Sequence, residues 1–278
     1  MKMTPFKSAL ACAVAFFAAT ALHAQTTVGN DGDTLAADLI LSFDTPSGDT
    51  GSGYNLEVDL GPIANFVTGG ADATGAPVSL SQLVVADLAT TTGSGSDGSG
   101  AGFGSSWFTS GNVNWSVVGA VGSGGGDGYT KYTIFGTKTT GDGAPTGSSQ
   151  STQSGPANKI VGYAGDLGGE DVTVNSNYSA FLATTDNLSF TGQTAGASSA
   201  FFGEPGLQSD FQTAAGDGDT ETLYAIKDTN GLAGTALGTF TLSSSGLTFQ
   251  AVPEPSTWAS IVLGAATLIG FSRRRRRA

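Results

Sequence analysis

Short runs of alternating apolar and polar residues recur along the chain. In the clearest run, residues 54–60, four apolar side chains alternate with three polar ones, Asn55, Glu57 and Asp59. Because successive side chains of a strand point to opposite faces, this run predicts an antiparallel strand with one buried face and one face in solvent. Further strands are predicted where Val, Thr and aromatic residues lie between Gly, Ser and Asp turns, at Ala37–Phe43, Val113–Val121, Tyr129–Phe135, Lys159–Tyr163, Glu221–Lys227, Leu237–Leu242 and Leu247–Gln250.

Helical spacing of apolar residues is rare in this chain. It predicts one helix over Ser79–Thr90 and a shorter one over Gly206–Ala214. Two segments rich in Gly, Ser and Thr, Gly93–Gly104 and Gly136–Gly155, predict long loops. Together these elements predict a mainly β fold, an antiparallel β-sandwich-like domain with one or two short helices and Gly/Ser-rich loops.

The N-terminal residues have the pattern of a secretory signal peptide. Two lysines precede the apolar run Ala9–Ala19, and small residues then allow cleavage after Ala21 or Ala24. The run is shorter than the 18 or so apolar residues that a membrane-spanning helix needs. We therefore expect residues 1–24 to be removed during export.

A second apolar run, residues 257–272, is followed by an arginine cluster. Sixteen residues form a helix of about 24 Å, which approaches the ~30 Å thickness of the hydrocarbon core of a membrane. The arginines would hold their end of this helix on the cytoplasmic side. The pattern predicts a single C-terminal transmembrane helix that keeps residues 25–252 outside the cytoplasm. The cluster consists of Arg273, Arg274, Arg275, Arg276 and Arg277.

Pro253, Glu254 and Pro255 stand directly before this apolar run. Pro-Glu-Pro, a short apolar helix and an arginine cluster, in that order, resemble the PEP-CTERM sorting signal of exported proteins in Gram-negative bacteria that make exopolysaccharide. The signal is also described as an ice-binding protein C-terminal domain. The resemblance covers Val252–Ala278 and implies that an exosortase recognises the Pro-Glu-Pro motif, processes the tail 253–278 and delivers the protein to the cell surface.

This resemblance implies a route and a set of partners. The chain would pass the Sec translocon, remain anchored in the inner membrane by its C-terminal helix, and then meet the exosortase. Its destination would be the cell surface or the extracellular matrix, where exopolysaccharide is the further partner we expect. The resemblance says nothing about the activity of the ectodomain, residues 25–252.

Removing both ends makes the remaining chain strongly acidic. The full chain has a net charge of −12, whereas residues 25–252 contain four Lys, no Arg and 22 Asp and Glu, a net charge of −18. Such a chain has no basic patch for nucleic acid. The ectodomain also lacks His and Cys, which excludes Ser-His-Asp catalysis, cysteine nucleophiles and His/Cys zinc sites. We therefore expect a protein that is not an enzyme and that has no resident cofactor.

Two acidic turns could hold a hard cation. The tetrapeptide Asp-Gly-Asp-Thr occurs twice and supplies Asp31 and Asp33, and again Asp217 and Asp219. Closely spaced carboxylates suit Ca²⁺, although neither copy has the spacing of an EF-hand. Exposed turns without a metal remain the alternative. A further acidic motif, Asp49-Thr50-Gly51, matches the loop of aspartic proteases but has no second copy in the chain, so we expect a simple turn there.

Three hypotheses for the function of the ectodomain remain. The leading hypothesis is a structural or adhesive protein of the cell surface or exopolysaccharide matrix. The first alternative is a secreted carbohydrate-active enzyme with paired carboxylates, which needs no His or Cys. The second is a polysaccharide- or ice-binding module, in which Trp107, Trp115 and Tyr129 could stack on sugar rings; aromatic residues in strands more often belong to the core, which is the interpretation we favour.

Overall fold

We describe the protein from a computed structural model. It describes residues 38–45, 48–67, 70–73, 76–83, 85–89, 102–109, 112–126, 128–141, 143–167, 179–184, 189, 213–214 and 219–252. The predicted signal peptide and the C-terminal tail lie outside these residues, as does most of the helix predicted over Gly206–Ala214.

Ten strands form one antiparallel sheet within the described residues. Their order is β3-β10-β9-β8-β5-β4-β1-β2-β6, and β7 pairs with β4 outside this path. The strands are β1 (Asp38–Asp44), β2 (Tyr54–Pro62), β3 (Val78–Leu80), β4 (Asn114–Ala120), β5 (Ile134–Thr139), β6 (Ser179–Ala183), β7 (Thr213–Ala214), β8 (Asp219–Ile226), β9 (Thr235–Ser243) and β10 (Gly246–Ala251). The helical segments are η1 (Ile63–Phe66), α1 (Val85–Ala89) and α2 (Gln150–Leu167).

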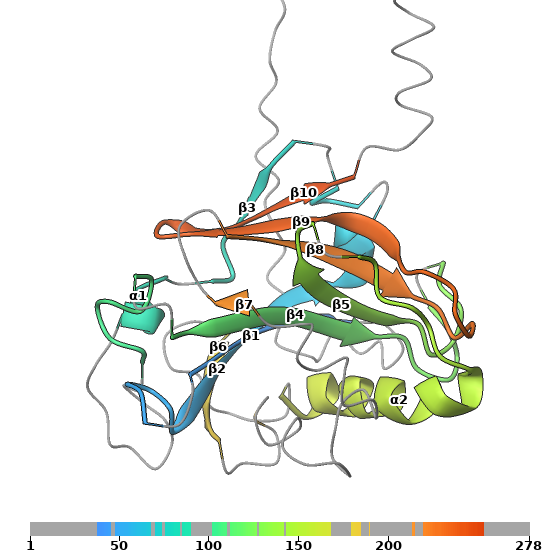
Figure 1. The fold of residues 1–278 in the computed structure, drawn as a ribbon, viewed down its shortest axis with the longest axis horizontal. Helices are drawn as coiled ribbons and strands as arrows, with labels where there is room; N and C mark the ends of the chain where they lie inside the picture. Colours follow the sequence, from blue (N-terminus) through green and yellow to red (C-terminus); the bar gives the residue numbers. More distant parts are fainter. Residues whose placement is uncertain are drawn as a thin grey trace, which may run out of the picture.

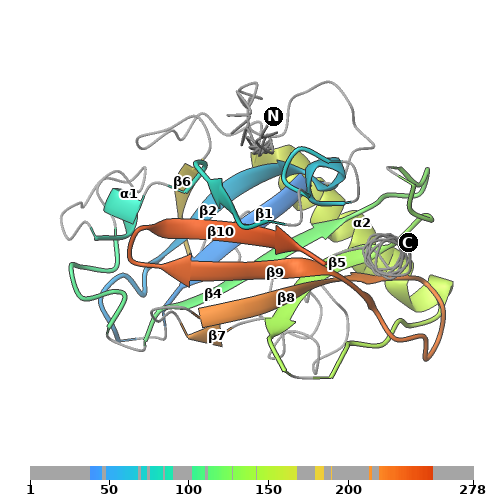
Figure 2. The ribbon, with the colours of Figure 1, turned by 90° about the horizontal axis from the view of Figure 1, so that it is seen from above.

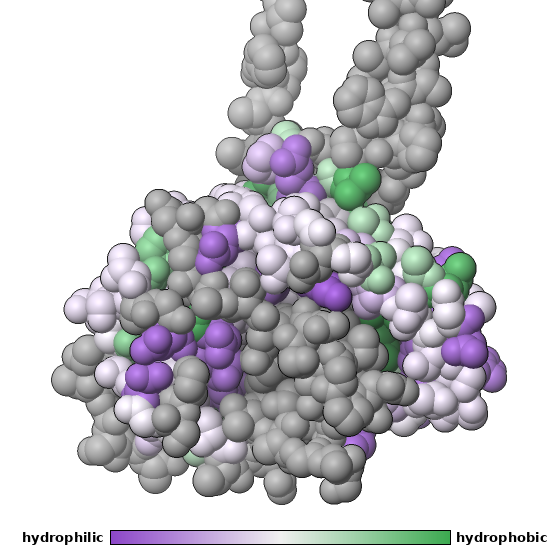
Figure 3. Space-filling model, in the orientation of Figure 1, coloured by the Kyte–Doolittle hydropathy of each residue, from purple (hydrophilic) through white to green (hydrophobic). Residues whose placement is uncertain are grey.

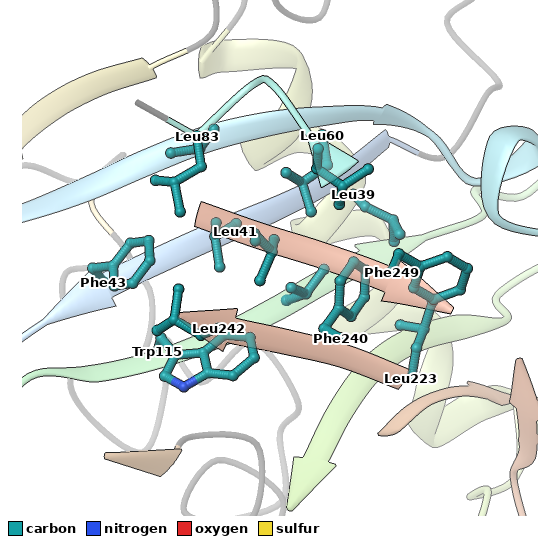
Figure 4. Close-up of a cluster of buried hydrophobic side chains, with 14 of the residues drawn as sticks. Leu39, Leu41, Phe43, Leu60, Leu83, Trp115, Leu223, Phe240, Leu242 and Phe249 are labelled. Carbon is teal, nitrogen blue, oxygen red and sulfur yellow. The ribbon is translucent and has the colours of Figure 1, made fainter. Parts of the chain in front are cut away.

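The sheet bends so that its two halves face each other (Figure 1). Strands β8, β9 and β10 form the upper half in that view, and β4, β1 and β2 form the lower half. Alternate residues of every one of these strands point into the space between the halves and make the main hydrophobic core, part of which is drawn in Figure 4. The ring of Phe66 in η1 closes one side, with centroids 5.8 Å from Phe240 and 5.1 Å from Phe249.

The side chain of Thr137 holds the sheet together where it divides. Strand β4 pairs with β5 through Val118–Ala120 and with the short strand β7 through Asn114 and Trp115. Between these two regions the Thr137 hydroxyl accepts a hydrogen bond from the Val117 N–H at 2.9 Å and donates one to the Val117 carbonyl at 3.5 Å. The side chain thereby replaces a backbone partner, and β5 can leave β4 to continue beside β8.

Helix α2 packs on the outer face of the lower half. Its residues Ala157, Ile160 and Ala164 form a second apolar cluster with side chains that include Ile40 and Val118. The buried side chain of Gln153 anchors the start of the helix, because its amide donates at 2.8 Å to the carbonyls of both Tyr132 and Ile226 and its oxygen accepts from Ser148 N at 3.1 Å.

The mainly β, antiparallel fold predicted from alternation is confirmed, with one hydrogen-bonded sheet supplying both layers. Some local predictions are wrong. Lys159–Tyr163 lies within α2 and is not a strand, and α2 also occupies the end of the predicted loop Gly136–Gly155. The helix predicted over Ser79–Thr90 is reduced to α1, because Val78–Leu80 forms an edge strand beside β10.

The polar face of β2 is buried, which corrects the prediction that it lies in solvent. Asn55, Glu57 and Asp59 are at most 5% exposed. Each has a local hydrogen bond: Asn55 Nδ2 donates to Phe43 O at 3.4 Å, the Ser42 hydroxyl donates to Glu57 Oε2, and Asp59 Oδ1 accepts from Gly61 N at 2.7 Å. Both faces of β2 are therefore buried. Its apolar residues face the main core, and its polar residues form a buried, hydrogen-bonded layer on the opposite face.

Candidate functional site

The fold reaches the residue before the Pro-Glu-Pro motif. Strand β10 lies between β9 and β3 and ends with Ala251 opposite Gly238. One residue later, the Val252 N–H donates to the Leu237 carbonyl at 2.9 Å, while the Val252 side chain is 49% exposed. The junction therefore has no spacer: the next residue after this hydrogen bond is Pro253.

Aromatic packing holds strand β10 in place. The Phe249 ring packs against Phe240, with centroids 4.8 Å apart, and against Phe66. On β9, Gly238 leaves room for that ring, since a Cβ at this position would lie 2.2 Å from Phe249 Cζ. This packing fixes β10 to the sheet up to the boundary of the motif.

The residues predicted to act in sorting lie beyond the described part of the chain. Pro253, Glu254 and Pro255 fall outside it, and so do Arg273, Arg274, Arg275, Arg276 and Arg277. The same holds for the predicted transmembrane run, residues 257–272. Among the helices that the structure does describe, none combines the length and the hydropathy needed to cross a membrane.

Only one of the four calcium candidates can be placed. Asp219 begins β8, is half-buried and pairs with Leu242, whereas Asp31, Asp33 and Asp217 lie outside the described residues. Within the described residues, Asp, Glu, His and Cys side chains form no group of three or more that could hold a metal ion. The acidic Asp49-Thr50-Gly51 segment is a turn between β1 and β2, as predicted, with Ser52 N donating to Asp49 O at 3.1 Å.

The aromatic residues considered for sugar stacking belong to the core. Trp115 is fully buried and lies beside Leu242 in Figure 4. Trp107 is 3% exposed and packs edge-on against Phe43 with centroids 6.3 Å apart. Tyr129 is half-buried and packs edge-on against Phe135 at 4.9 Å. The interpretation of these residues as core side chains is confirmed.

The structure shows one buried acid that sequence reasoning did not single out. Glu221 of β8 is 0% exposed and faces the interior, opposite Phe240 on β9 and Thr139 on β5. Burial raises the pKa of its carboxyl well above the ordinary value; the Thr137 hydroxyl offsets part of this effect and the carboxylate of Asp219 adds to it. Thr137 is also engaged with Val117, and neither carboxyl oxygen of Glu221 has a hydrogen-bond partner of normal geometry.

A period-two pattern would have revealed this position. Glu221 alternates with Thr220 and Thr222 and shares its face with the buried residues Leu223 and Ala225. Asp219 lies two residues before it on the same face, so the two Cα atoms are about 6.6 Å apart at the usual rise of a strand. The structure thus brings two carboxyl groups together at this end of β8, one half-buried and one enclosed.

Comparisons with known proteins identify the tail alone. Residues 251–277 match the model of the PEP-CTERM protein-sorting motif. Searches of curated proteins and of solved structures found no match to the chain. The motif marks an exported protein that carries a membrane-associated sorting signal and is processed by an exosortase. The chain therefore carries a PEP-CTERM sorting motif, which begins where the last strand of its β fold ends.

Proposed function

We propose that the protein is a structural or adhesive component of the cell surface or the exopolysaccharide matrix. The observation that carries this proposal is the position of Val252, which hydrogen-bonds to the sheet although it lies within the matched residues 251–277 and directly before Pro253. Because β10 ends at Ala251, removal of the tail leaves the hydrogen bonds of this strand intact. A folded, acidic domain is then released or transferred as a unit.

The anchoring part of this proposal concerns the tail. The helix 257–272 holds the protein in the inner membrane of a Gram-negative cell, with Arg273–Arg277 on the cytoplasmic side, until the exosortase acts at Pro253-Glu254-Pro255. The N-terminal residues 1–24 have by then been removed. The two prolines disfavour a continuous helix, so the motif stays extended and accessible between the domain and the membrane.

Mass spectrometry of the surface-exposed protein tests this order of events. The wild-type protein should yield peptides up to about Val252 and none that contains Arg273–Arg277. A variant with alanine at Pro253, Glu254 and Pro255 should keep its arginines and fractionate with the inner membrane. A matched variant with alanine at three exposed loop residues, Ser105, Ser106 and Thr109, should be processed like the wild type. Recovery of the intact arginine tail from released wild-type protein would contradict the proposal.

The structural role needs a separate readout. Deleting the gene should reduce the amount of exopolysaccharide that stays with washed cells, and the wild-type gene should restore it. The motif variant should fail to restore it, because its domain remains at the inner membrane. If deletion leaves retained polysaccharide and cell adhesion unchanged, the structural role is wrong even when processing occurs.

One observation favours a second candidate, a hydrolase with paired carboxylates. Asp219 and Glu221 share one face of β8, and the raised pKa of Glu221 is the property expected of a general acid. Glu221 is fully enclosed, and its strand lies between β9 and β5, so a substrate would reach it only after the two halves of the sheet moved apart. Release of reducing ends from the host polysaccharide, abolished by Glu221→Gln, would support this candidate over the structural role.

A further inference from the structure

Six threonines share the outer face of the upper half of the sheet. They are Thr140, Thr220, Thr222, Thr239, Thr241 and Thr248, and we call this set the threonine face. Thr241 lies opposite both Thr248 of β10 and Thr220 of β8, and the Thr140 N–H donates to the Thr220 carbonyl at 3.0 Å, so these four form one row across the strands. Thr239 and Thr222 pair in a second row.

The opposite side of the same strands fixes the orientation of these side chains. Leu223, Phe240 and Phe249 alternate with the threonines and are fully buried in the core. A shift of register by one residue would expose them, so the threonines are held outward. β-Branched side chains also have few χ1 rotamers, so the hydroxyl and methyl groups keep defined positions. They are spaced at about 4.8 Å between strands and about 6.6 Å along a strand.

The face is open and near neutral in polarity. Figure 2 looks onto the outer side of β8, β9 and β10. Thr140 is exposed, and the five threonines within the strands are partly exposed. Figure 3 shows this half of the domain from the side, with many residues in white, the colour of the middle of the hydropathy scale, beside smaller purple and green patches. This surface therefore offers hydroxyl and methyl groups together, without a large apolar side chain.

Charge is segregated away from this face. The ectodomain has 22 acidic residues, yet among the described residues of β3, β5, β8, β9 and β10 none of the acids points outward with the threonines. In β8 both acids, Asp219 and Glu221, alternate with Thr220 and Thr222 and face inward. The one charged neighbour on the face, within these strands, is Lys138, opposite Thr222. A surface without acids on a domain of this net charge is suited to an uncharged partner.

We propose that the threonine face binds a neutral polysaccharide chain. Sugar hydroxyls can both donate to and accept from threonine hydroxyls, and the methyl groups can contact the C–H faces of sugar rings. No carboxylate needs to lose its hydration on binding, which would cost free energy. Anionic polymers are instead repelled by the net negative field of the domain. The inference rests on the matrix role proposed above and names the class of ligand and the surface that holds it.

Co-sedimentation of the full chain, purified in a mild detergent, tests the proposal. The probes are two insoluble neutral glucans, cellulose and a linear β-1,3-glucan, with covalently cross-linked alginate beads in calcium-free buffer as the anionic comparison. The wild-type protein should bind at least one glucan and not alginate. The triple variant Thr222→Val, Thr239→Val, Thr241→Val should bind at least about tenfold more weakly, because it loses three hydroxyl groups that would hydrogen-bond the sugar.

The valine substitutions should leave the sheet folded, so that a loss of glucan binding reflects the loss of the hydroxyl groups. Valine keeps the shape and strand preference of threonine, and unchanged circular dichroism and melting temperature would confirm an intact sheet. The matched control replaces Thr50, Thr146 and Thr229 with valine, three exposed threonines outside the face. This control should bind glucan like the wild type.

Several binding results would overturn the proposal. They are absence of wild-type binding to both glucans, equal binding by the triple variant, and equal or stronger binding to alginate. Adsorption to ice crystals without glucan binding would also overturn it and assign the face to ordered water. Because the triple variant should still be exported and processed, failure of glucan binding with normal processing rejects this inference alone. Failure of processing rejects the sorting part of the proposed function.

Discussion

Glu221 of β8 and Phe240 of β9 lie directly opposite each other in the antiparallel ladder, and both side chains are 0% exposed. A carboxyl group and a phenyl ring therefore share one region of the core. The environment disfavours the charged form of the acid, which raises the pKa of Glu221 well above its ordinary value. The folded protein consequently keeps a proton on this group that the unfolded chain releases at lower pH.

Replacing Glu221 with Gln should remove part of the pH dependence of stability. In the unfolded chain the carboxyl ionises near its ordinary pKa of 4.5, and in the folded protein it ionises at higher pH. The stability linked to this group is fully present below the unfolded pKa and is lost as pH rises through the folded pKa. Urea denaturation at pH 4.5 and pH 8 should show a larger fall in unfolding free energy for the wild type than for Glu221→Gln.

The control for this experiment is Asp49→Asn, which changes a carboxylate in the turn between β1 and β2. It should leave the difference between the two pH values close to that of the wild type. If Glu221→Gln and the wild type lose the same free energy between pH 4.5 and pH 8, burial does not raise the pKa of Glu221 above that of the unfolded chain.

Substitution of Gly238 by Ala should destabilise the sheet next to the sorting motif. The added Cβ would lie 2.2 Å from Phe249 Cζ and 2.7 Å from the Gln250 carbonyl oxygen, so both β10 and the ring must move. Overpacking of this kind costs about 1–3 kcal/mol. Thermal melts should show a lower melting temperature, and hydrogen exchange should increase in β10 first.

Gly162→Ala is the matched substitution. Gly162 lies within α2, it is exposed and does not precede a proline, and a Cβ there meets no side chain or distant backbone atom within 4 Å. Alanine should therefore stabilise the protein by about 0.5–1 kcal/mol, the usual difference from glycine in a helix. Equal effects of the two alanines would mean that the contact between Phe249 and Gly238 is not a tight one.

Gln153→Leu should be far more damaging than Gln150→Leu. Gln153 is buried and satisfies two carbonyls and one N–H of the backbone, whereas the exposed side chain of Gln150 donates to Asp228. Each buried group left without a partner costs about 1–3 kcal/mol, so a loss on the order of 3 kcal/mol or more is expected for Gln153. Chemical denaturation gives both values, and a loss below about 1 kcal/mol for Gln153→Leu would refute the anchoring of α2.

Calcium should raise the melting temperature if the Asp-Gly-Asp-Thr turns bind it. The candidates are Asp31, Asp33, Asp217 and Asp219, and a ligand that binds only the folded state stabilises it by mass action. Melts in millimolar calcium and in chelator should differ for the wild type and coincide for a variant with Asn at all four positions. Identical wild-type melts in the two buffers would leave these segments as plain acidic turns.

The alternation of apolar and polar residues predicted most of the strands, because one face of nearly every strand is apolar. Strands β1, β2, β4, β8, β9 and β10 all lie within two residues of their predicted bounds. Strand β5 begins at Ile134 instead of Tyr129. Tyr132 has a positive φ of 59°, which is incompatible with the extended backbone of a strand. Strands β3 and β7 have three and two residues, too few for a period-two pattern to emerge. The five-residue strand β6 was also missed, for its sequence SAFLA contains no β-branched residue.

Helix α2 could not be predicted from the local sequence pattern. Its sequence contains Gly155, Pro156 and several serines, which indicate a loop, and its apolar stretch KIVGY is short enough to suit a strand. The helix is stabilised by distant partners, the carbonyls bound by Gln153 and the apolar cluster beneath Ile160. The prediction that Glu57 lies in solvent was wrong for a similar reason. The alternation shows that Glu57 and Leu56 lie on opposite faces of β2, but it does not show that the face of Glu57 is also buried in the fold.

Strand β3 fixes an order of events during secretion. This edge strand pairs with β10, and the ring of Phe66, in the preceding helical segment η1, packs on Phe240 and Phe249. These residues need partners from the end of the domain, so an exported chain can close its sheet only after residue 251 has left the membrane. The sorting motif begins at that same residue. The domain can therefore complete its fold only when the processing signal has reached the membrane.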